Sequence, residues 1–213
     1  MDELLKGYRR FRKRGWVQQR ERWSAAAEGQ SPKALVVACS DSRVDPALLF
    51  DAAPGEIFSV RNVANLIPPI DQGLSHGATA ALEYAVTVLG VKHIIIMGHA
   101  TCGGVMASIK HLFEDAEPGH GAYVRTWVQL LDDARDRVVA KYGDGPEGQY
   151  ELELEAVRVS LDNLRTYAFI AEREAAGTLQ LHGFYFGIAE GQLFMMDKAG
   201  NFEAVKNKKG LFG

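Results

Sequence analysis

The sequence has few cysteines and no long apolar run, and each absence narrows the possible functions. Only two cysteines, Cys39 and Cys102, occur in 213 residues, which excludes a disulfide-rich scaffold and favours reduced thiols. No apolar stretch reaches 18 residues, and the N-terminus opens with Asp2 and Glu3 rather than with a signal peptide. We therefore expect a cytoplasmic protein with no membrane partner.

The net charge is also small. A formal charge of −3 at pH 7 and a pI near 6.1 give no general attraction to nucleic acid. One basic cluster, RRFRKR at residues 9–14, could contact phosphate, but its helical periodicity and acidic neighbours favour a solvated or inter-subunit face. We expect no nucleic-acid partner.

The chain is rich enough in apolar residues to fold as one domain. Hydrophobic residues make up 47% of it, which suffices for a single core. Residues 2–28 have a helical periodicity with only a narrow apolar stripe, so this helix should dock against the main body or a second subunit. The pattern predicts an N-terminal helical arm at residues 1–30 and an α/β domain at residues 31–213.

Apolar runs and turn signals predict the elements of that domain. Asp45 and Pro46 indicate a capped short helix that runs to about Phe50. Strands are predicted at residues 33–38, 56–60 and 92–97, helices at 75–89, 103–113, 122–141 and 150–175, and a hairpin at 179–197. The fold class is α/β, a single domain with a central, largely parallel β-sheet flanked by helices, plus the arm.

Soft metal-binding groups follow two of the predicted strands. Cys39 ends one strand, and His99 and Cys102 occupy the turn after another. Because ligands bind at the carboxyl ends of parallel strands, these three side chains can reach one ion. Two thiolates and one imidazole suit Zn²⁺, and three protein ligands leave a fourth position open for water, as in catalytic zinc sites.

Two other interpretations of these residues stay open. His99 could simply satisfy a hydrogen bond, with both cysteines acting as small buried hydrophobic residues. The chain could also be a structural zinc module for protein association, although structural sites are usually closed by four Cys or His ligands. Here the fourth candidate is an aspartate, Asp41.

Asp41 and Arg43 flank Ser42 on the turn after Cys39. The Asp41 carboxylate should lie close enough to the metal to accept a hydrogen bond from a bound hydroxide or to ligate the zinc itself. Arg43 can keep that carboxylate ionised and aimed. The alternative is a surface ion pair of little consequence.

Three motifs together resemble those of the β-class carbonic anhydrases: CSDSR at 39–43, RNVAN at 61–65 and GHATCGG at 98–104. The resemblance runs from about Gln30 to His182. It implies a zinc lyase that reversibly hydrates CO2 to bicarbonate and a proton by attack of a zinc-bound hydroxide. It further implies Cys39, His99 and Cys102 as zinc ligands and Asp41 with Arg43 as the catalytic dyad. The family's homodimers or assemblies of dimers imply that the arm embraces a partner subunit.

The resemblance also implies a substrate pocket. Gln30, Phe58, Val63 and Tyr84 match the pocket of the plant-like (type I) branch, in which the glutamine, phenylalanine and tyrosine come from the neighbouring subunit. Gly103 joins the substrate-binding set. That origin would explain why Tyr84 lies off the apolar face of its predicted helix. The alternative activity is hydrolysis of carbonyl sulfide or carbon disulfide. Both are linear analogues of CO2 that members of this family also use.

Overall fold

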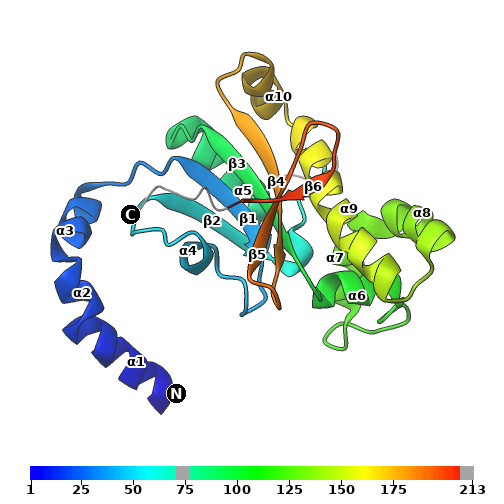
Figure 1. Ribbon diagram of the computed structural model, residues 1–213, viewed down its shortest axis with the longest axis horizontal. Helices are drawn as coiled ribbons and strands as arrows, with labels where there is room; N and C mark the ends of the chain where they lie inside the picture. The colour runs from blue at the N-terminus through cyan, green and yellow to red at the C-terminus, as the bar shows by residue number, and fades with distance from the viewer. Residues whose placement is uncertain (71–76, 207–213) are drawn as a thin grey trace.

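The protein, described by a computed structural model over residues 1–70 and 77–206, is built on one six-stranded sheet of order β2-β1-β3-β4-β5-β6 (Figure 1). The strands are β1 (Ala34–Cys39), β2 (Ile57–Asn62), β3 (His93–His99), β4 (Gln180–Gly187), β5 (Gln192–Met196) and β6 (Phe202–Ala204). The first four are parallel, and β5 and β6 continue the sheet in antiparallel pairing. This confirms the predicted α/β fold with a largely parallel sheet.

Helices cover the sheet and form the arm (Figure 1). They are α1 (Asp2–Lys13), α2 (Gly15–Gln18), α3 (Arg20–Glu28), α4 (Pro46–Leu49), α5 (Gly77–Glu83), α6 (Gly103–Ile109), α7 (Ala122–Val128), α8 (Asp132–Tyr142), α9 (Pro146–Arg165) and α10 (Ala168–Ala175). Short turns of helix lie at η1 (Val63–Asn65), η3 (Tyr84–Val88) and η4 (Gln129–Leu131). Among the described helices, none is both long and apolar enough to cross a membrane.

Alternate residues of the central strands pack on opposite faces. Leu35 and Val37 of β1 lie in a core cluster with residues of α5, α9 and α10, whereas Val36 and Ala38 pack with Leu49 and its neighbours on the other face. Because both faces are covered, every residue of β1 is buried. The continuous apolar run in the sequence reflects this burial, and the carboxyl ends of β1 and β3 emerge at one edge of the sheet.

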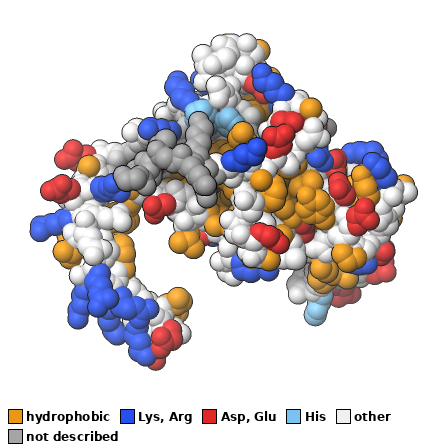
Figure 2. All heavy atoms as spheres, viewed as in Figure 1, with side chains coloured by type: hydrophobic (Ala, Val, Ile, Leu, Met, Phe, Trp, Pro, Cys, Tyr) orange, Lys and Arg blue, Asp and Glu red, His pale blue; other side chains and the backbone are white. Residues whose placement is uncertain are grey.

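The arm has an apolar stripe that this chain leaves uncovered. Within the described residues, α1, α2 and α3 bury no side chain, and the arm curves away from the body in Figure 1. Leu4 and Tyr8 are 74% and 59% exposed. Lys and Arg side chains gather over the same segment in Figure 2, and the Arg12 guanidinium stacks 4.0 Å from the Trp16 ring centroid.

Several predicted elements differ from the structure. The helix predicted at 2–28 is divided into α1, α2 and α3, and the helix predicted at 122–141 is divided into α7, η4 and α8. The helix predicted at 150–175 is two helices, because Tyr167 leaves the helical conformation, is 2% exposed and donates a hydrogen bond to the Pro68 carbonyl. The helix predicted at 103–113 ends at Ile109, and His111 and Phe113 adopt positive φ angles just beyond it. Strand β6 was not predicted. Residues 75 and 76 of one predicted helix, and residues 207–213 of the predicted domain, lie outside the described residues.

Candidate metal and substrate site

Cys39, His99 and Cys102 meet at the carboxyl edge of the sheet. Cys39 ends β1, His99 ends β3, and Cys102 immediately precedes α6. All three are buried, and their ligand atoms lie within 4.8 Å of one another. The topology therefore brings together the three residues that the sequence proposed as metal ligands.

The spacing and orientation of these atoms fit a tetrahedral zinc ion. The two Sγ atoms are 3.8 Å apart, the separation expected for two thiolates at about 2.3 Å from a tetrahedral zinc. His99 Nδ1–H donates to the Ala100 carbonyl at 2.9 Å, which fixes the tautomer and leaves Nε2 as an acceptor. That buried Nε2 has no hydrogen-bond partner among the described residues. A metal ion would satisfy it.

The same three groups perturb one another's protonation. A hydrogen bond from Cys102 lowers the pKa of Cys39, whereas the hydrogen bond to Cys39 and burial raise the pKa of Cys102. Burial lowers the pKa of His99, but the negative charge of the nearby Cys39 thiolate and the hydrogen bond to the Ala100 carbonyl raise it, and the net shift is upward. Cys39 is therefore the thiol that ionises first, and a divalent ion bound by the three groups would displace the protons that remain.

Asp41 and Arg43 form a bidentate ion pair beside this cluster. Arg43 Nε donates to Asp41 Oδ1 at 2.9 Å, and its Nη2 donates to Oδ2 at 2.7 Å. Arg43 also donates to the hydroxyl and carbonyl oxygens of Thr101, whose φ angle is positive. The Arg43 guanidinium holds the pKa of Asp41 well below its usual range. The carboxylate is engaged by arginine and is not a member of the three-residue group.

Arg61 anchors the turn that carries Cys39 and Asp41. Its guanidinium donates to the carbonyl oxygens of both residues and to Asp45 Oδ2. Arg61 opens the RNVAN motif, but its role in holding this turn was not predicted. These contacts could not be predicted from local sequence, because Arg61 lies 16 to 22 residues from its partners along the chain.

Two of the predicted substrate-binding residues lie next to the metal ligands. Val63 packs against the apolar cluster that contains Cys39 and Cys102. A Cβ on Gly104 would lie 2.5 Å from Val63 Cγ1, so the glycine permits this close contact. Gly103 precedes it, and a Cβ there would meet open space. Both predicted residues therefore border the cluster.

The other three predicted pocket residues lie elsewhere in this chain. Phe58 and Tyr84 contact each other, with ring centroids 5.9 Å apart. Phe58 pairs with Leu35, four positions before Cys39 on β1, which corresponds to about 13 Å along the strand. Gln30 lines a cavity of about 670 Å³ between α3 and the segment that joins α4 to β2. These side chains belong to the amino-end side of the parallel strands.

Glu153 of α9 is a site neighbour that the sequence did not reveal. Its carboxylate accepts the Cys102 N–H at 2.9 Å and is 3% exposed. Burial raises its pKa, and its hydrogen bonds partly offset that effect. The one available signal was its spacing, since Gln149, Glu153 and Val157 are four residues apart and share a helix face.

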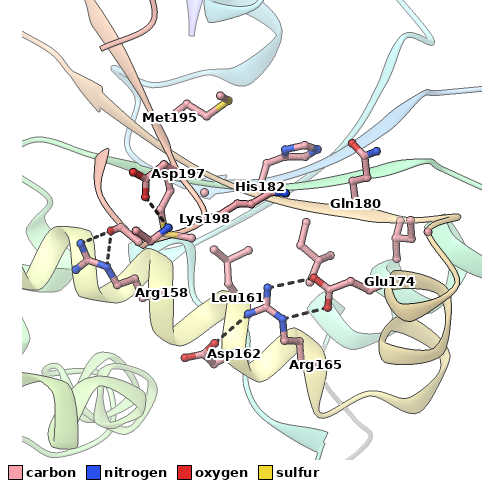
Figure 3. A pocket seen from close by; sticks show the side chains of 17 residues that line it. Arg158, Leu161, Asp162, Arg165, Glu174, Gln180, His182, Met195, Asp197 and Lys198 are labelled. Atoms are coloured by element: carbon pink, nitrogen blue, oxygen red, sulfur yellow. Dashed lines mark hydrogen bonds and ion pairs between the residues drawn. The ribbon is translucent and has the colours of Figure 1, made fainter. Parts of the chain in front are cut away.

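A separate cavity of about 940 Å³ lies under the turn between β5 and β6, against α9 (Figure 3). Its arginines already have partners: Arg165 pairs with Glu174 and Asp162, and Arg158 donates to the Gly200 carbonyl. None of the predicted site residues lines it. It therefore contributes nothing to the candidate site.

Comparison with known proteins points to one family. The sequence profile of the carbonic anhydrase family matches residues 34–193. The chain is 35% identical over 192 residues to the mitochondrial beta carbonic anhydrase 6 of Arabidopsis thaliana, covering 89% of this chain and 65% of that protein. The chain thus spans slightly less than two thirds of this relative.

Solved structures agree with the sequence comparison. The β-carbonic anhydrase CcaA has a TM-score of 0.90 and 32% identity, with 96% of this chain and 99% of that chain covered. A tetrameric β-carbonic anhydrase of the ascomycete Sordaria macrospora has a TM-score of 0.77 and 28% identity, with 92% and 95% covered. By its motifs, its fold and these similarities, the chain belongs to the β-carbonic anhydrase family.

Proposed function

We propose that this protein is a zinc enzyme that interconverts CO2 and bicarbonate. The observation that carries the proposal is the buried Cys39–His99–Cys102 group, whose thiolate spacing and unpartnered imidazole nitrogen fit one tetrahedral ion. A zinc ion held by these three residues would supply hydroxide at neutral pH, because zinc lowers the pKa of bound water to about 7.

The chain's own charged residues would orient the reactants. Arg43 donates hydrogen bonds to both oxygens of Asp41, so the carboxylate stays ionised. It can then accept a further hydrogen bond from a group beside the cluster. With Asp41 held by arginine, the fourth metal position stays available to water. This favours an open catalytic site over a structural site closed by Asp41.

We further propose that the substrate pocket is completed by a second copy of the chain. Val63 and Gly103 supply one wall, and Gln30, Phe58 and Tyr84 of the other copy supply the rest. The uncovered apolar stripe of the arm, residues 1–30, would pack on that copy, while residues 31–213 form the zinc-binding domain. The tetrameric assembly named for the Sordaria proteins is in keeping with a homodimer or an assembly of dimers.

The remaining proposals concern partners and location. CO2 and bicarbonate are the proposed ligands, and neither nucleic acid nor a membrane is proposed as a partner. A cytoplasmic location stays a prediction; the Arabidopsis relative is mitochondrial by name, so imaging of the tagged full-length protein would test it.

Stopped-flow CO2 hydration tests the activity. Protein of measured zinc content would be assayed from pH ~6.5 to 9, a range that brackets a metal-bound water. We expect rapid turnover that scales with zinc and rises with pH through one apparent pKa. Absence of turnover at every pH in fully loaded protein would contradict the proposal, and turnover of carbonyl sulfide or carbon disulfide in its place would identify the alternative.

A further inference from the structure

Glu153 is a carboxylate with an unusually complete set of neutral donors. Oε1 accepts the Cys102 backbone N–H at 2.9 Å and Gln149 Nε2 at 3.1 Å, and Oε2 accepts the Tyr185 hydroxyl at 2.8 Å. No Lys or Arg forms an ion pair with it in the described part of the chain. Burying a carboxylate costs free energy of folding unless hydrogen bonds satisfy it. A functional role would explain why this carboxylate is buried here.

Close packing of α9 against the end of β3 brings Glu153 to the metal ligands. A Cβ on Gly98 would lie 2.8 Å from Val157 Cγ2 and 3.4 Å from the Glu153 carbonyl. Any larger residue at position 98 would therefore push α9 away. Tyr185, 4% exposed on the adjacent strand β4, holds the second carboxylate oxygen from the other side. The carboxylate is thus held by Gln149 of its own helix and by Tyr185 of β4 in addition to Cys102.

We propose that Glu153 is a positioning residue for zinc, acting through Cys102. The Cys102 N–H precedes α6, and Glu153 Oε1 is its hydrogen-bond acceptor. This contact fixes the peptide from which the thiol projects, so that Sγ faces Cys39 and His99 Nε2. Residues that orient metal ligands in this way typically contribute 10- to 100-fold to metal affinity. The inference rests on the proposed function, because it takes Cys102 as a ligand.

The backbone of each cysteine is then held by a hydrogen bond to a charged side chain, and the two side chains have opposite charges. The guanidinium of Arg61 donates to the carbonyl of Cys39, and the carboxylate of Glu153 accepts the N–H of Cys102. Each contact joins a ligand to a residue on another element, 22 and 51 positions away respectively. The site's geometry therefore depends on the packing of β2 and α9 as well as on the ligand motifs.

Three substitutions of Glu153 distinguish the role of its hydrogen-bond acceptor from the role of its negative charge. Glu153→Ala removes both. Glu153→Asp keeps the charge but shortens the side chain by one methylene, so it cannot reach the Cys102 N–H in the same backbone position. Glu153→Gln keeps an acceptor oxygen for Cys102 and Gln149, and its amide NH2 can donate to the Tyr185 hydroxyl, which also accepts. Glu155→Ala on the same helix is the matched control, because within residues 1–70 and 77–206 the ion pairs of Glu155 are with Arg137 and Arg158.

Zinc affinity, measured by chelator competition on the full chain, is the primary readout, and the cobalt–thiolate absorption band of Co²⁺-substituted protein is the second. We expect Glu153→Ala and Glu153→Asp to bind zinc about 10- to 100-fold more weakly with an altered cobalt spectrum. Glu153→Gln should stay within about threefold of wild type, and Glu155→Ala should be unchanged.

Wild-type zinc affinity in Glu153→Asp would overturn the proposal, as would a loss in Glu153→Gln equal to that in the aspartate variant. If Glu153→Ala does not fold, the aspartate and glutamine variants still decide the question. Cys102→Ser in the same competition tests the ligand assignment separately: if it retains full affinity, the proposed function fails at this residue, whatever Glu153 does.

Discussion

The two ends of the parallel strands differ in how much of the candidate site one chain supplies. At the carboxyl end, Cys39 and His99 join Cys102 in a buried group within 4.8 Å, with the Asp41–Arg43 pair beside it. At the amino-end side, Phe58 and Tyr84 contact each other about 13 Å along the strands from that group. The comparison shows that the proposed metal ligands meet within one chain, and it motivates our proposal that the substrate pocket requires a second copy.

Replacing a proposed metal ligand disrupts only the part of the site at the carboxyl ends of the strands. It should have the largest effect on activity. Cys39→Ser replaces a thiolate by a neutral hydroxyl, so we expect zinc content to fall from about one ion per chain to nearly none, with turnover lost in parallel. The residues proposed to meet the second copy are untouched, so the oligomeric state should not change. Metal analysis and light scattering would check both results.

Ser42→Ala is the control for this substitution, because Ser42 is exposed on the same turn and should tolerate the change. A Cys39→Ser protein that keeps full zinc content would remove Cys39 from the ligand set.

Removing the charge of Asp41 should have a smaller effect at the same end. In Asp41→Asn the bidentate contact with Arg43 is lost, while the three metal ligands remain. We expect turnover to fall roughly 10- to 100-fold, as for other residues that orient a metal-bound group, with zinc content unchanged. Equal turnover in the two proteins, measured at matched zinc content, would exclude Asp41 from the reaction.

The smallest expected effect is on the free energy of unfolding. Its pH dependence tests the Asp41–Arg43 ion pair at the carboxyl end. Arg43 depresses the pKa of Asp41 in the folded chain, so the pair stabilises the fold above the unfolded value of about 3.9 and loses that contribution as pH falls through the depressed pKa. In zinc-free protein, wild type should exceed Asp41→Asn in free energy of unfolding at pH 5–7, and the difference should shrink toward zero in acid.

Because that contact lies within one chain, the difference between the two proteins should not depend on protein concentration. Urea denaturation at two concentrations would measure it. A difference that grows on acidification would contradict the assigned sign.

The sequence predicted those features that short segments determine. The Asp45 side chain caps α4 in front of Pro46 as expected, and the apolar runs of β1 and β3 placed Cys39 and His99 at one sheet edge. Tyr84, assigned to the exposed side of its helix, is 45% exposed. In each case the local pattern of residues was sufficient.

The features that the sequence did not predict depend on contacts between distant segments. The chain ends α9 before Tyr167 because that side chain reaches Pro68, 99 positions away, and no local breaker marks the site. Glu153 resembles an ordinary helical glutamate until its partner Cys102 is known. Similarly, nothing in the sequence shows that the Arg61 guanidinium is fully engaged by the Cys39 turn.

Mixing two inactive proteins tests the central claim most directly. Cys39→Ser keeps the pocket side chains, and a variant with Phe58→Ala and Tyr84→Ala keeps the metal ligands. If the pocket comes from the partner copy, a mixed dimer has one intact site and one doubly defective site. Co-expressed chains should then recover up to about a quarter of wild-type CO2 hydration per chain, well above either parent protein. Activity no higher than the average of the two parents would show that each chain builds its own pocket and would contradict the account.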